Sequence, residues 1–356
     1  MNVTFKDVAK LAGVSTQTVS RVTNGSPNVA EETRKKVNAA VKELGYVPNQ
    51  GAQILGRARS KVVGLVTLDI LLHGASLIAN GVRKQAKELG YGTSLSAVSE
   101  NSFEKITAAI RDFQSQRVEF IILNIPLSKE EAEMLVEQYS AIHFVFIDVP
   151  PNAQVHAVYG ASYDGARQAA ELMLSLQRKR LLLITGPHHS SASELRLQAW
   201  VDVLQDDPNA RIVTQFEGDW QARSGYLLAR EALSNGADFD GVLVGNDQMA
   251  LGVLRALNEF NLAVPQEISV IGFDDTYDSA YFSPPLTTIK QDFLLIGKRS
   301  VLMALSMAEQ PLKECRQESI VTQLIERKST QLYQQGRDNK QQMRILLKKF
   351  EKLLSE

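Results

Sequence analysis

The chain has 356 residues, 44% hydrophobic and 22% charged, a balance typical of soluble globular domains at a length too great for one core. A single cysteine, Cys315, excludes an internal disulfide and favours a reducing compartment. The chain begins with no signal-peptide pattern and holds no apolar run near the ~20 residues of a membrane span, so we expect a cytoplasmic protein with no membrane partner. The net charge of −1 conceals +5 over residues 1–60, −9 over 61–330 and +3 over 331–356, which places a polyanion contact at the N-terminus.

The first 24 residues predict two short helices separated by a tight turn. Thr4 is a good N-cap, Asp7 suits the first turn, and Gly13 can adopt the positive φ that ends the helix. The predicted inward face of this helix comprises Val8, Leu11 and Ala12.

Ser15 can cap the second helix, whose Val19 and Val22 are predicted to face inward. Its outward positions are Thr16, Gln17, Thr18, Ser20 and Arg21. Hydroxyls, an amide and a guanidinium suit base edges and phosphates in a major groove, although a capped helical hairpin on a solvated surface is the alternative.

A third helix is predicted over 31–44, ended by Gly45, so that about 45 residues form a small helical domain. Residues 46–49 read as an extended break because Pro48 disfavours helix before it. Residues 49–59 predict a short helix that is too weak to form without a partner.

From residue 60 the pattern changes to short apolar runs alternating with helices, which predicts a doubly wound α/β body of two lobes. The expected buried strands are 62–66, 121–123, 144–147, 181–185, 242–244 and 268–273. Expected helices between them include 79–89, 106–113, 166–176 and 248–260.

Four of these strands end in polar residues: Asn124, Asp148, Asn246-Asp247 and Asp274-Asp275. Ligands bind at the carboxyl ends of strands in open α/β sheets, so the pattern predicts a cleft suited to a polyhydroxylated molecule. The alternative is that these residues cap the following helices, which we expect of Asp247 and weigh evenly for Asp275.

The C-terminal tail divides into a polar tether, 331–340, and a helix, 341–356. In the helix an a/d seam is predicted from Met343, Leu347, Phe350 and Leu354. Two heptads are unstable alone, so the helix is expected to associate with copies of itself; a disordered basic tail is the alternative.

The motifs resemble the lactose/galactose repressor family of bacterial transcriptional regulators, and within it the lactose-type branch. They are Asp-Val-Ala…Ala-Gly-Val-Ser…Thr-Val-Ser-Arg-Val at 7–22, Gly-Asp-Trp at 218–220, Asn-Asp-Gln-Met-Ala-Leu-Gly at 246–252 and Pro-Pro-Leu-Thr-Thr-Ile-Lys-Gln-Asp-Phe at 284–293. The resemblance implies an α-helical helix-turn-helix headpiece (1–46), a hinge helix (47–60) and a two-lobed periplasmic-binding-protein-like body that binds effector and dimerises (61–330). It further implies a tether (331–340) and a coiled-coil tetramerisation helix (341–356).

The resemblance also assigns site residues. The implied DNA contacts are Thr4, Phe5, Ser15, Thr16, Gln17, Thr18, Ser20, Arg21, Asn24, Thr33, Tyr46, Asn49, Ala52, Gln53 and Leu55. Leu55 matches a leucine that wedges into the minor groove, which bends the duplex. The implied effector contacts are Leu72, Asn124, Asp148, Arg196, Trp220, Asn246, Asp274, Gln291 and Phe293.

The chemistry of the effector set agrees with a saccharide ligand. Arg196 offers a rigid fork of donors to vicinal hydroxyls, carboxylates accept from them, and Trp220 offers a flat apolar face. Taken singly, Trp220 could belong to the core and Arg196 could pair with Glu194 on the surface.

Four positions depart from the lactose-type pattern. Thr16 stands where a tyrosine is expected on the recognition helix, which shifts the expected operator preference. In the pocket, Leu68 and Ala192 replace serines, and Gly160 replaces an aromatic residue beside Tyr159. The sugar class is therefore better defined than the particular sugar.

The resulting expectation is a dimeric repressor, tetrameric through its tail, that binds a pseudo-palindromic operator and releases it when a galactoside-like sugar occupies the cleft. Rival classes are a transport-type sugar-binding protein, a regulator that needs its ligand to bind DNA, and a glycosidase using Asp148 and Asp274. Arg196 is expected to keep these acids ionised, which disfavours acid catalysis. We expect no cofactor or metal, because no dinucleotide-binding glycine motif follows a strand and His188-His189 lacks metal-site spacing.

Overall fold

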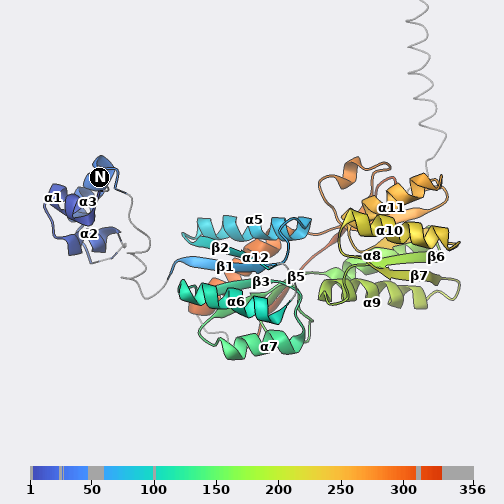
Figure 1. Cartoon of the computed structure of the whole chain (residues 1–356), viewed down its shortest axis with the longest axis horizontal. Helices are drawn as coiled ribbons and strands as arrows, with labels where there is room; N and C mark the ends of the chain where they lie inside the picture. Colours follow the sequence, from blue (N-terminus) through green and yellow to red (C-terminus); the bar gives the residue numbers. More distant parts are fainter. Residues whose placement is uncertain are drawn as a thin grey trace, which may run out of the picture. The chain divides into compact units, whose positions relative to one another are not determined.

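The computed structural model describes residues 3–23, 26, 28–46, 60–98, 102–309 and 314–330. The chain divides into two compact units after Ser60, a headpiece and a body (Figure 1). Residues 47–59 of the predicted hinge, the C-terminal tail from residue 331 and five assigned DNA contacts lie outside the described residues. These contacts are Asn24, Asn49, Ala52, Gln53 and Leu55.

The headpiece begins with the two predicted helices, α1 (Phe5–Ala12) and α2 (Thr16–Thr23), followed by α3 (Glu31–Glu43). The Asp7 carboxylate accepts hydrogen bonds from the Thr4 backbone N–H at 2.9 Å and the Thr4 hydroxyl at 2.7 Å. Gly13 has a φ of 65° and ends α1, while Ser15 Oγ accepts from the backbone N–H of Thr18 at 3.1 Å. The sequence therefore specifies this helix pair through its caps.

The headpiece core is built from all three helices and Tyr46. Its buried members are Val8, Ala9, Val19, Val22, Val37, Ala40 and Tyr46. The prediction that Leu11 faces inward is wrong, since its side chain is 46% exposed. Because α1 packs against both α2 and α3, its buried stripe is centred between Val8 and Ala9, and Leu11 falls outside it.

Within the described residues the body holds two six-stranded sheets. The first sheet has the order β11-β5-β4-β3-β1-β2 with every pairing parallel. Its strands are β1 (Val62–Thr67), β2 (Gly92–Ala97), β3 (Phe120–Asn124), β4 (His143–Phe146), β5 (Ala157–Gly160) and β11 (Gln317–Ile320).

The second sheet has the order β12-β10-β9-β8-β6-β7 and is parallel except for its edge strand β12. Its strands are β6 (Arg180–Thr185), β7 (Arg211–Glu217), β8 (Gly241–Val244), β9 (Ser269–Asp274), β10 (Thr287–Lys290) and β12 (Gln323–Ile325). A 3₁₀ turn, η1 (Ser279–Tyr281), follows β9.

Helices cover both faces of each sheet, as expected for a doubly wound fold (Figure 1). In the first lobe α5 (His73–Glu88) and α12 (Phe293–Glu309) cover one face, and α6 (Phe103–Ser115) and α7 (Lys129–Gln138) cover the other. In the second lobe α10 (Ala222–Ser234) and α11 (Asp247–Glu259) lie opposite α8 (Ser162–Ser175) and α9 (Ser191–Gln205).

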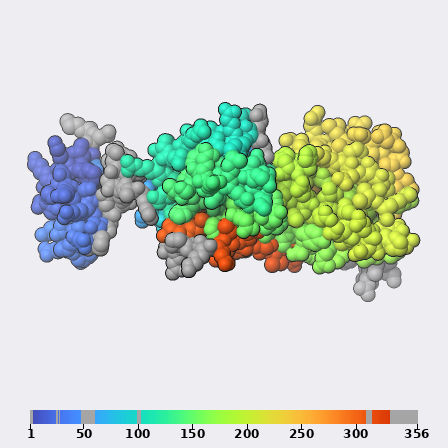
Figure 2. All heavy atoms as spheres, turned by 90° about the horizontal axis from the view of Figure 1, so that it is seen from below, coloured from blue at the N-terminus to red at the C-terminus, as the bar shows by residue number. Residues whose placement is uncertain are grey.

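The chain crosses between the lobes three times: from β5 to α8, from β10 to α12 and from β11 to β12. The last described segments therefore return to both lobes. Figure 2 shows this return, with residues beyond 290 in orange and red lying along the first lobe, whose other visible residues are cyan and green. The two-lobed prediction is confirmed by this topology.

The six predicted strands are all present, with no end displaced by more than one residue. The apolar-run pattern did not predict β2, β5, β7, β10, β11 and β12. β2 and β7 are edge strands with largely exposed residues, and β10 carries the buried polar residues Thr287 and Thr288. Continuous apolar runs mark only strands covered on both faces.

Two helix pairs approach closely through glycines. A Cβ at Gly297 of α12 would meet the carbonyl oxygen of Ile78 in α5, and a Cβ at Gly81 of α5 would meet that of Leu294 in α12. Gly225 and Gly252 have the same reciprocal relation between α10 and α11. Glycine here is required by backbone-to-backbone contact.

We expect Gly297→Ala to lower the stability of the body by about 1–3 kcal/mol, because the added methyl group forces α5 and α12 apart. Alanine is the better helix former by ~1 kcal/mol, so a net loss reports the clash. Thermal unfolding measures the effect, with Gly92→Ala as control because its Cβ would lie at an ordinary 3.6 Å from Val62. Equal midpoints for the two variants would contradict the packing argument.

Candidate functional site

A cavity of about 920 Å³ lies at the carboxyl ends of the parallel strands and is lined by residues of both lobes. All nine residues assigned to the effector line it: Leu72, Asn124, Asp148, Arg196, Trp220, Asn246, Asp274, Gln291 and Phe293. The structure therefore brings together the whole set that sequence motifs pointed to, although it does not test their roles.

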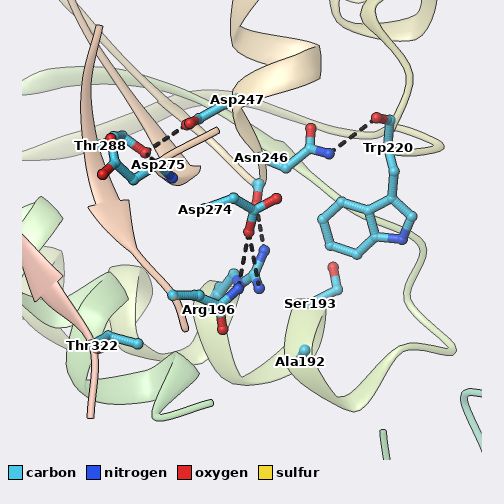
Figure 3. A network of polar contacts seen from close by, with 12 residues as sticks. Ala192, Ser193, Arg196, Trp220, Asn246, Asp247, Asp274, Asp275, Thr288 and Thr322 are labelled. Atoms are coloured by element: carbon cyan, nitrogen blue, oxygen red, sulfur yellow. Dashed lines mark hydrogen bonds and ion pairs between the residues drawn. The ribbon is translucent and has the colours of Figure 1, made fainter. Parts of the chain in front are cut away.

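The buried part of the cavity lining, which we call its floor, contains Arg196 of α9 beside Asp274; Figure 3 shows these two side chains. The side chain of Arg196 is buried; its guanidinium carbon lies 3.8 Å from the centre of the Phe273 ring and 5.4 Å from that of Trp220. One terminal nitrogen donates to the carbonyl of Gly245, and the other lies 4.0 Å from Asp274 Oδ1. The alternative pairing of Arg196 with Glu194 on the surface is wrong.

Asp274 ends β9 beside this guanidinium and accepts a hydrogen bond of 2.9 Å from Gln291 Nε2. Burial raises the pKa of both Asp274 and Asp148, and in each case it outweighs the opposing charge of Arg196. The expectation from the sequence is that Arg196 keeps these acids ionised. Its charge acts in the expected direction, but desolvation dominates.

Asp148 follows β4 in the first lobe and contacts α9 of the second. Its Oδ1 accepts from the backbone N–H of Ala192 at 3.1 Å, and the side chain of Ser190, the N-cap of α9, also contributes to its hydrogen bonding. A carboxylate at a helix N-terminus is favoured by the exposed N–H groups and the helix dipole. Asp148 therefore links the two lobes across the cavity.

The helix cap at the start of α11 is Asn246, whereas the sequence predicted Asp247. Asn246 is the N-cap of α11: its Oδ1 accepts from the backbone N–H of Met249 at 2.9 Å, and its Nδ2 donates to the carbonyl of Trp220 at 3.0 Å. Asp247, expected as the cap, is buried and accepts from Thr276, Ser279 and Thr288. Asp275 caps no helix and pairs with Arg327 at 2.6 Å.

Trp220 lies against the cavity and against the core of the second lobe, so both proposed placements of its ring are partly right. Its φ of 71° is unusual for a bulky residue, and a Cβ at Gly186 would fall inside its indole. Positive φ at Arg117, Gln177 and Asn261 follows helix ends, whereas Trp220, Asp274 and Asp275 carry it beside the cavity. Strained backbone of this kind collects at binding sites.

The first-lobe wall is largely apolar and contains two departures from the family pattern. Leu68 packs against the lobe core and also lines the cavity. Its side chain makes this part of the wall apolar, where a serine would present a hydroxyl. The space freed at Gly160 is taken by the carboxamide of Gln291, and the Tyr159 hydroxyl donates to Gln317 at 3.2 Å. Tyr159 does line the cavity.

Several residues line the cavity without having been predicted as effector contacts. They are Asp69, His73, His189, Ser190, Ser191 and Gln248. His73 opens α5, two turns earlier than the predicted helix start, and its ring meets Phe293 edge-on at 6.4 Å. The early start of α5 is what places Leu72 and His73 at the cavity.

Metal-site geometry is not found among the side chains that the structure describes. His188 and His189 lie in a turn, and His188 Nδ1 lies 2.6 Å from Glu217 Oε2. None of the described helices has both the length and the apolar character to cross a bilayer.

In the headpiece the predicted DNA-facing residues fall into two groups. Thr4, Ser15, Thr16, Gln17 and Arg21 are exposed, while Thr18, Ser20 and Thr33 are half-buried. Phe5 and Tyr46 instead pack together in the core, with ring centres 5.5 Å apart and Tyr46 only 9% exposed. Apart from Thr4, the N-cap of α1, the exposed group lies on α2 and the turn before it, whereas Phe5 and Tyr46 contribute to the headpiece core.

A helix-turn-helix headpiece and a two-lobed α/β body with a polar cleft define a ligand-responsive DNA-binding regulator. A family model described as "Bacterial regulatory proteins, lacI family" matches residues 4–49, and a "Periplasmic binding protein-like domain" matches residues 170–330. The chain belongs to the lacI family of bacterial regulatory proteins.

Relatives support this over most of the chain. It is 38% identical to the lactose operon repressor of Escherichia coli (strain K12) over 328 residues, 92% of this chain and 91% of that one. A chain of the lac repressor dimer bound to operator and the anti-inducer ONPF superposes with a TM-score of 0.88 and 36% identity. The match covers 93% of this chain and 100% of that one. For the lac repressor bound to ONPG in the repressed state, the TM-score is 0.86 and the identity 37%, and the match covers 93% of this chain and 100% of that one. These relatives are transcriptional repressors rather than enzymes.

Proposed function

We propose that this protein is a cytoplasmic transcriptional repressor whose affinity for its operator falls when a galactoside-type sugar binds in the cleft of the body. The headpiece contacts the major groove through Gln17, Arg21 and the hydroxyls of α2. Two chains bind the two halves of a pseudo-palindrome, which matches the dimer named in the related structure. ONPG, bound by a relative, is a galactoside.

One observation carries the sugar assignment: the floor of the cavity combines a buried guanidinium with carboxylates and an indole. Arg196 is stacked on Phe273, and its Nε has no acceptor within the described chain, so the protein does not saturate its donors. Asp274 and Asp148 supply acceptors for hydroxyl groups, and Trp220 supplies an apolar face for a pyranose.

The switch is a shift between two relative orientations of the lobes. Asp148 already joins the first lobe to the N-terminus of α9, so a sugar hydroxyl that competes for this carboxylate favours one orientation over the other. The hinge segment 47–60 transmits that orientation to the headpieces, and coupling of ~1–3 kcal/mol is typical of such linkage. The tail helix 341–356 joins dimers into a tetramer that can hold two operators.

The test begins by selecting operators for the full chain from a random duplex library, followed by titration with β-galactosides, β-glucosides, pentoses and purines. Operator binding is followed by anisotropy and sugar binding by tryptophan fluorescence. The chain has two tryptophans, so Trp200→Phe leaves Trp220 as the reporter, and Trp220→Phe leaves Trp200, which is 1% exposed in the core. We expect galactosides to change Trp220 fluorescence and release the operator.

Other outcomes separate the parts of the proposal. A response only to another sugar replaces the galactoside and implicates Leu68, Gly160 and Ala192. Tighter operator binding with ligand reverses the sign of the switch. A selection that yields no palindromic site overturns the repressor assignment itself.

A further inference from the structure

The backbone that presents Asp274 to the cavity is a turn in an unfavourable conformation. Asp274 has a φ of 119° and Asp275 a φ of 56°, and neither is glycine. Aspartate tolerates the left-handed region better than most residues, but two consecutive positive φ angles persist only where surrounding contacts fix them. Contacts from outside the turn are therefore required to hold its conformation.

Arg327 forms an ion pair with Asp275, the second residue of the turn. Its guanidinium donates to Asp275 Oδ1 at 2.6 Å and to the carbonyl of Leu286 at 2.8 Å, and its backbone N–H donates to Thr287 Oγ1 at 2.8 Å. The two side chains of the ion pair are 19% and 16% exposed, so water competes little for either. Arg327 does not line the cavity, so it does not touch a ligand there.

The segment that carries Arg327 is itself fixed to the second sheet. Ser329 and Thr330 are at most 1% exposed, and Ser329 Oγ donates to the carbonyl of Val270 in β9 at 2.6 Å. The backbone N–H of Thr287 donates to Ser329 Oγ at 2.8 Å, and the hydroxyls of Thr287 and Thr330 lie 2.7 Å apart. Arg327 therefore acts from a rigid base on β9 and β10.

From the other side, Asp247 holds the same turn. It accepts from the backbone N–H of Thr276 at 2.9 Å and from Thr288 Oγ1, which also lies 3.4 Å from the backbone N of Asp275 (Figure 3). Between these two anchors, Gln291 and Arg196 are the close partners of the Asp274 carboxylate on the cavity side among the residues that the structure describes. Any relaxation of the turn moves that carboxylate away from both.

We propose that Arg327 is a positioning residue for the effector: its ion pair with Asp275 holds the left-handed turn that aims Asp274 into the cavity. The inference rests on the proposed function, because Asp274 acts there as an acceptor for the sugar. Hydrogen bonds lose strength steeply with small displacements, so effector affinity depends on a residue that never contacts the effector.

The experiment measures sugar affinity in the Trp200→Phe background for Arg327→Gln, Asp275→Asn and the double variant. Asparagine keeps the preference for positive φ while removing the charge, so it isolates the ion pair from the backbone. Each single variant is expected to lose affinity roughly ten-fold, and the double variant no more than either, because both remove one interaction. Operator affinity without sugar is expected to stay at the parental value.

Arg299→Gln is the matched control. Arg299 pairs with Glu318 in the first lobe, away from the cavity, through two hydrogen bonds of 2.5 and 2.9 Å, whereas Arg327 reaches Asp275 through one. Losses that add in the double variant, or an equal loss in the Arg299 variant, would overturn the proposal in favour of general destabilisation.

Hydrogen exchange provides a readout that needs no ligand. Arg327→Gln is expected to speed exchange of the amides of 274–276, and Arg299→Gln is not. Unchanged protection would overturn the proposal even if sugar affinity fell. A parental protein that binds no sugar at all while the exchange result holds would instead locate the failure in the proposed function.

Discussion

Replacing Arg196 by methionine is expected to lower sugar affinity at least ~100-fold while leaving operator binding without sugar intact, so that the repressor no longer responds to inducer. The reason lies in the floor of the cavity, where removal of the guanidinium leaves Asp274 without its countercharge and Phe273 without its stacked partner. Breaking a buried ion pair from one side typically weakens the structure around it by about 3–5 kcal/mol. Fluorescence titration and operator anisotropy give the two quantities.

The fork of Arg196 matters beyond its charge. Arg196→Lys keeps a cation but cannot stack flat on Phe273 or reach Gly245 and Asp274 together, so we expect at least ~10-fold weaker sugar binding. Arg230→Met serves as control, because Arg230 also lies over an aromatic ring, Tyr226 at 5.4 Å, but is exposed and away from the cavity. Full inducer response in Arg196→Met would contradict the assignment of this residue to the site.

The sequence located the residues that line the cavity better than it located the edge strands of the sheets, because the two depend on interactions of different range along the chain. Buried central strands are recognisable in the sequence as continuous apolar runs, and the polar residues at their carboxyl ends then indicate where the cleft lies. β10, in contrast, carries the buried hydroxyls of Thr287 and Thr288, which are satisfied by Arg327, Thr330 and Asp247, all at least 40 residues away in sequence. No local pattern contains that information.

Adjacent polar residues were the second difficulty. Asn246 and Asp247 are both acceptable caps, and the backbone decides between them: Asn246 is extended, with φ −153° and ψ 169°, so its side chain reaches the first turn of α11. Asp247, one residue later, points the other way into the core, where Gly272 leaves room for its carboxylate. Propensity alone assigns the cap to either.

The buried carboxylate of Asp247 is expected to make the stability of the protein depend on pH. Burial raises the pKa of Asp247 to about 7, with the charge of Asp274 adding to the effect, although hydrogen bonds from Ser279, Thr288 and Thr276 oppose it. The unfolded chain releases this proton near the ordinary aspartate pKa of 3.8, so between pH 3.8 and about 7 the folded state binds more protons than the unfolded state. Stability conferred by Asp247 is therefore complete below the unfolded pKa, falls as pH rises to about 7, and then levels off.

Between pH 5.5 and 8 the loss from this one group is on the order of 2 kcal/mol. Other acids contribute in both directions: the pKa of Asp148 is raised, and those of Glu217 and Glu259 are lowered. The informative quantity is thus the difference in pH dependence between the parent and Asp247→Asn, measured by denaturant unfolding. Asp112→Asn, on the exposed face of α6, controls for the loss of a negative charge.

We expect the Asn variant to be less stable than the parent at pH 5.5, since its amide presents donors to three groups that already donate. The gap should narrow or reverse towards pH 8, where the parent carries a buried charge. A gap that stays constant across this range would show that Asp247 remains ionised throughout. The three hydrogen bonds would then outweigh desolvation, and the turn that presents Asp274 would be anchored by a permanent buried anion.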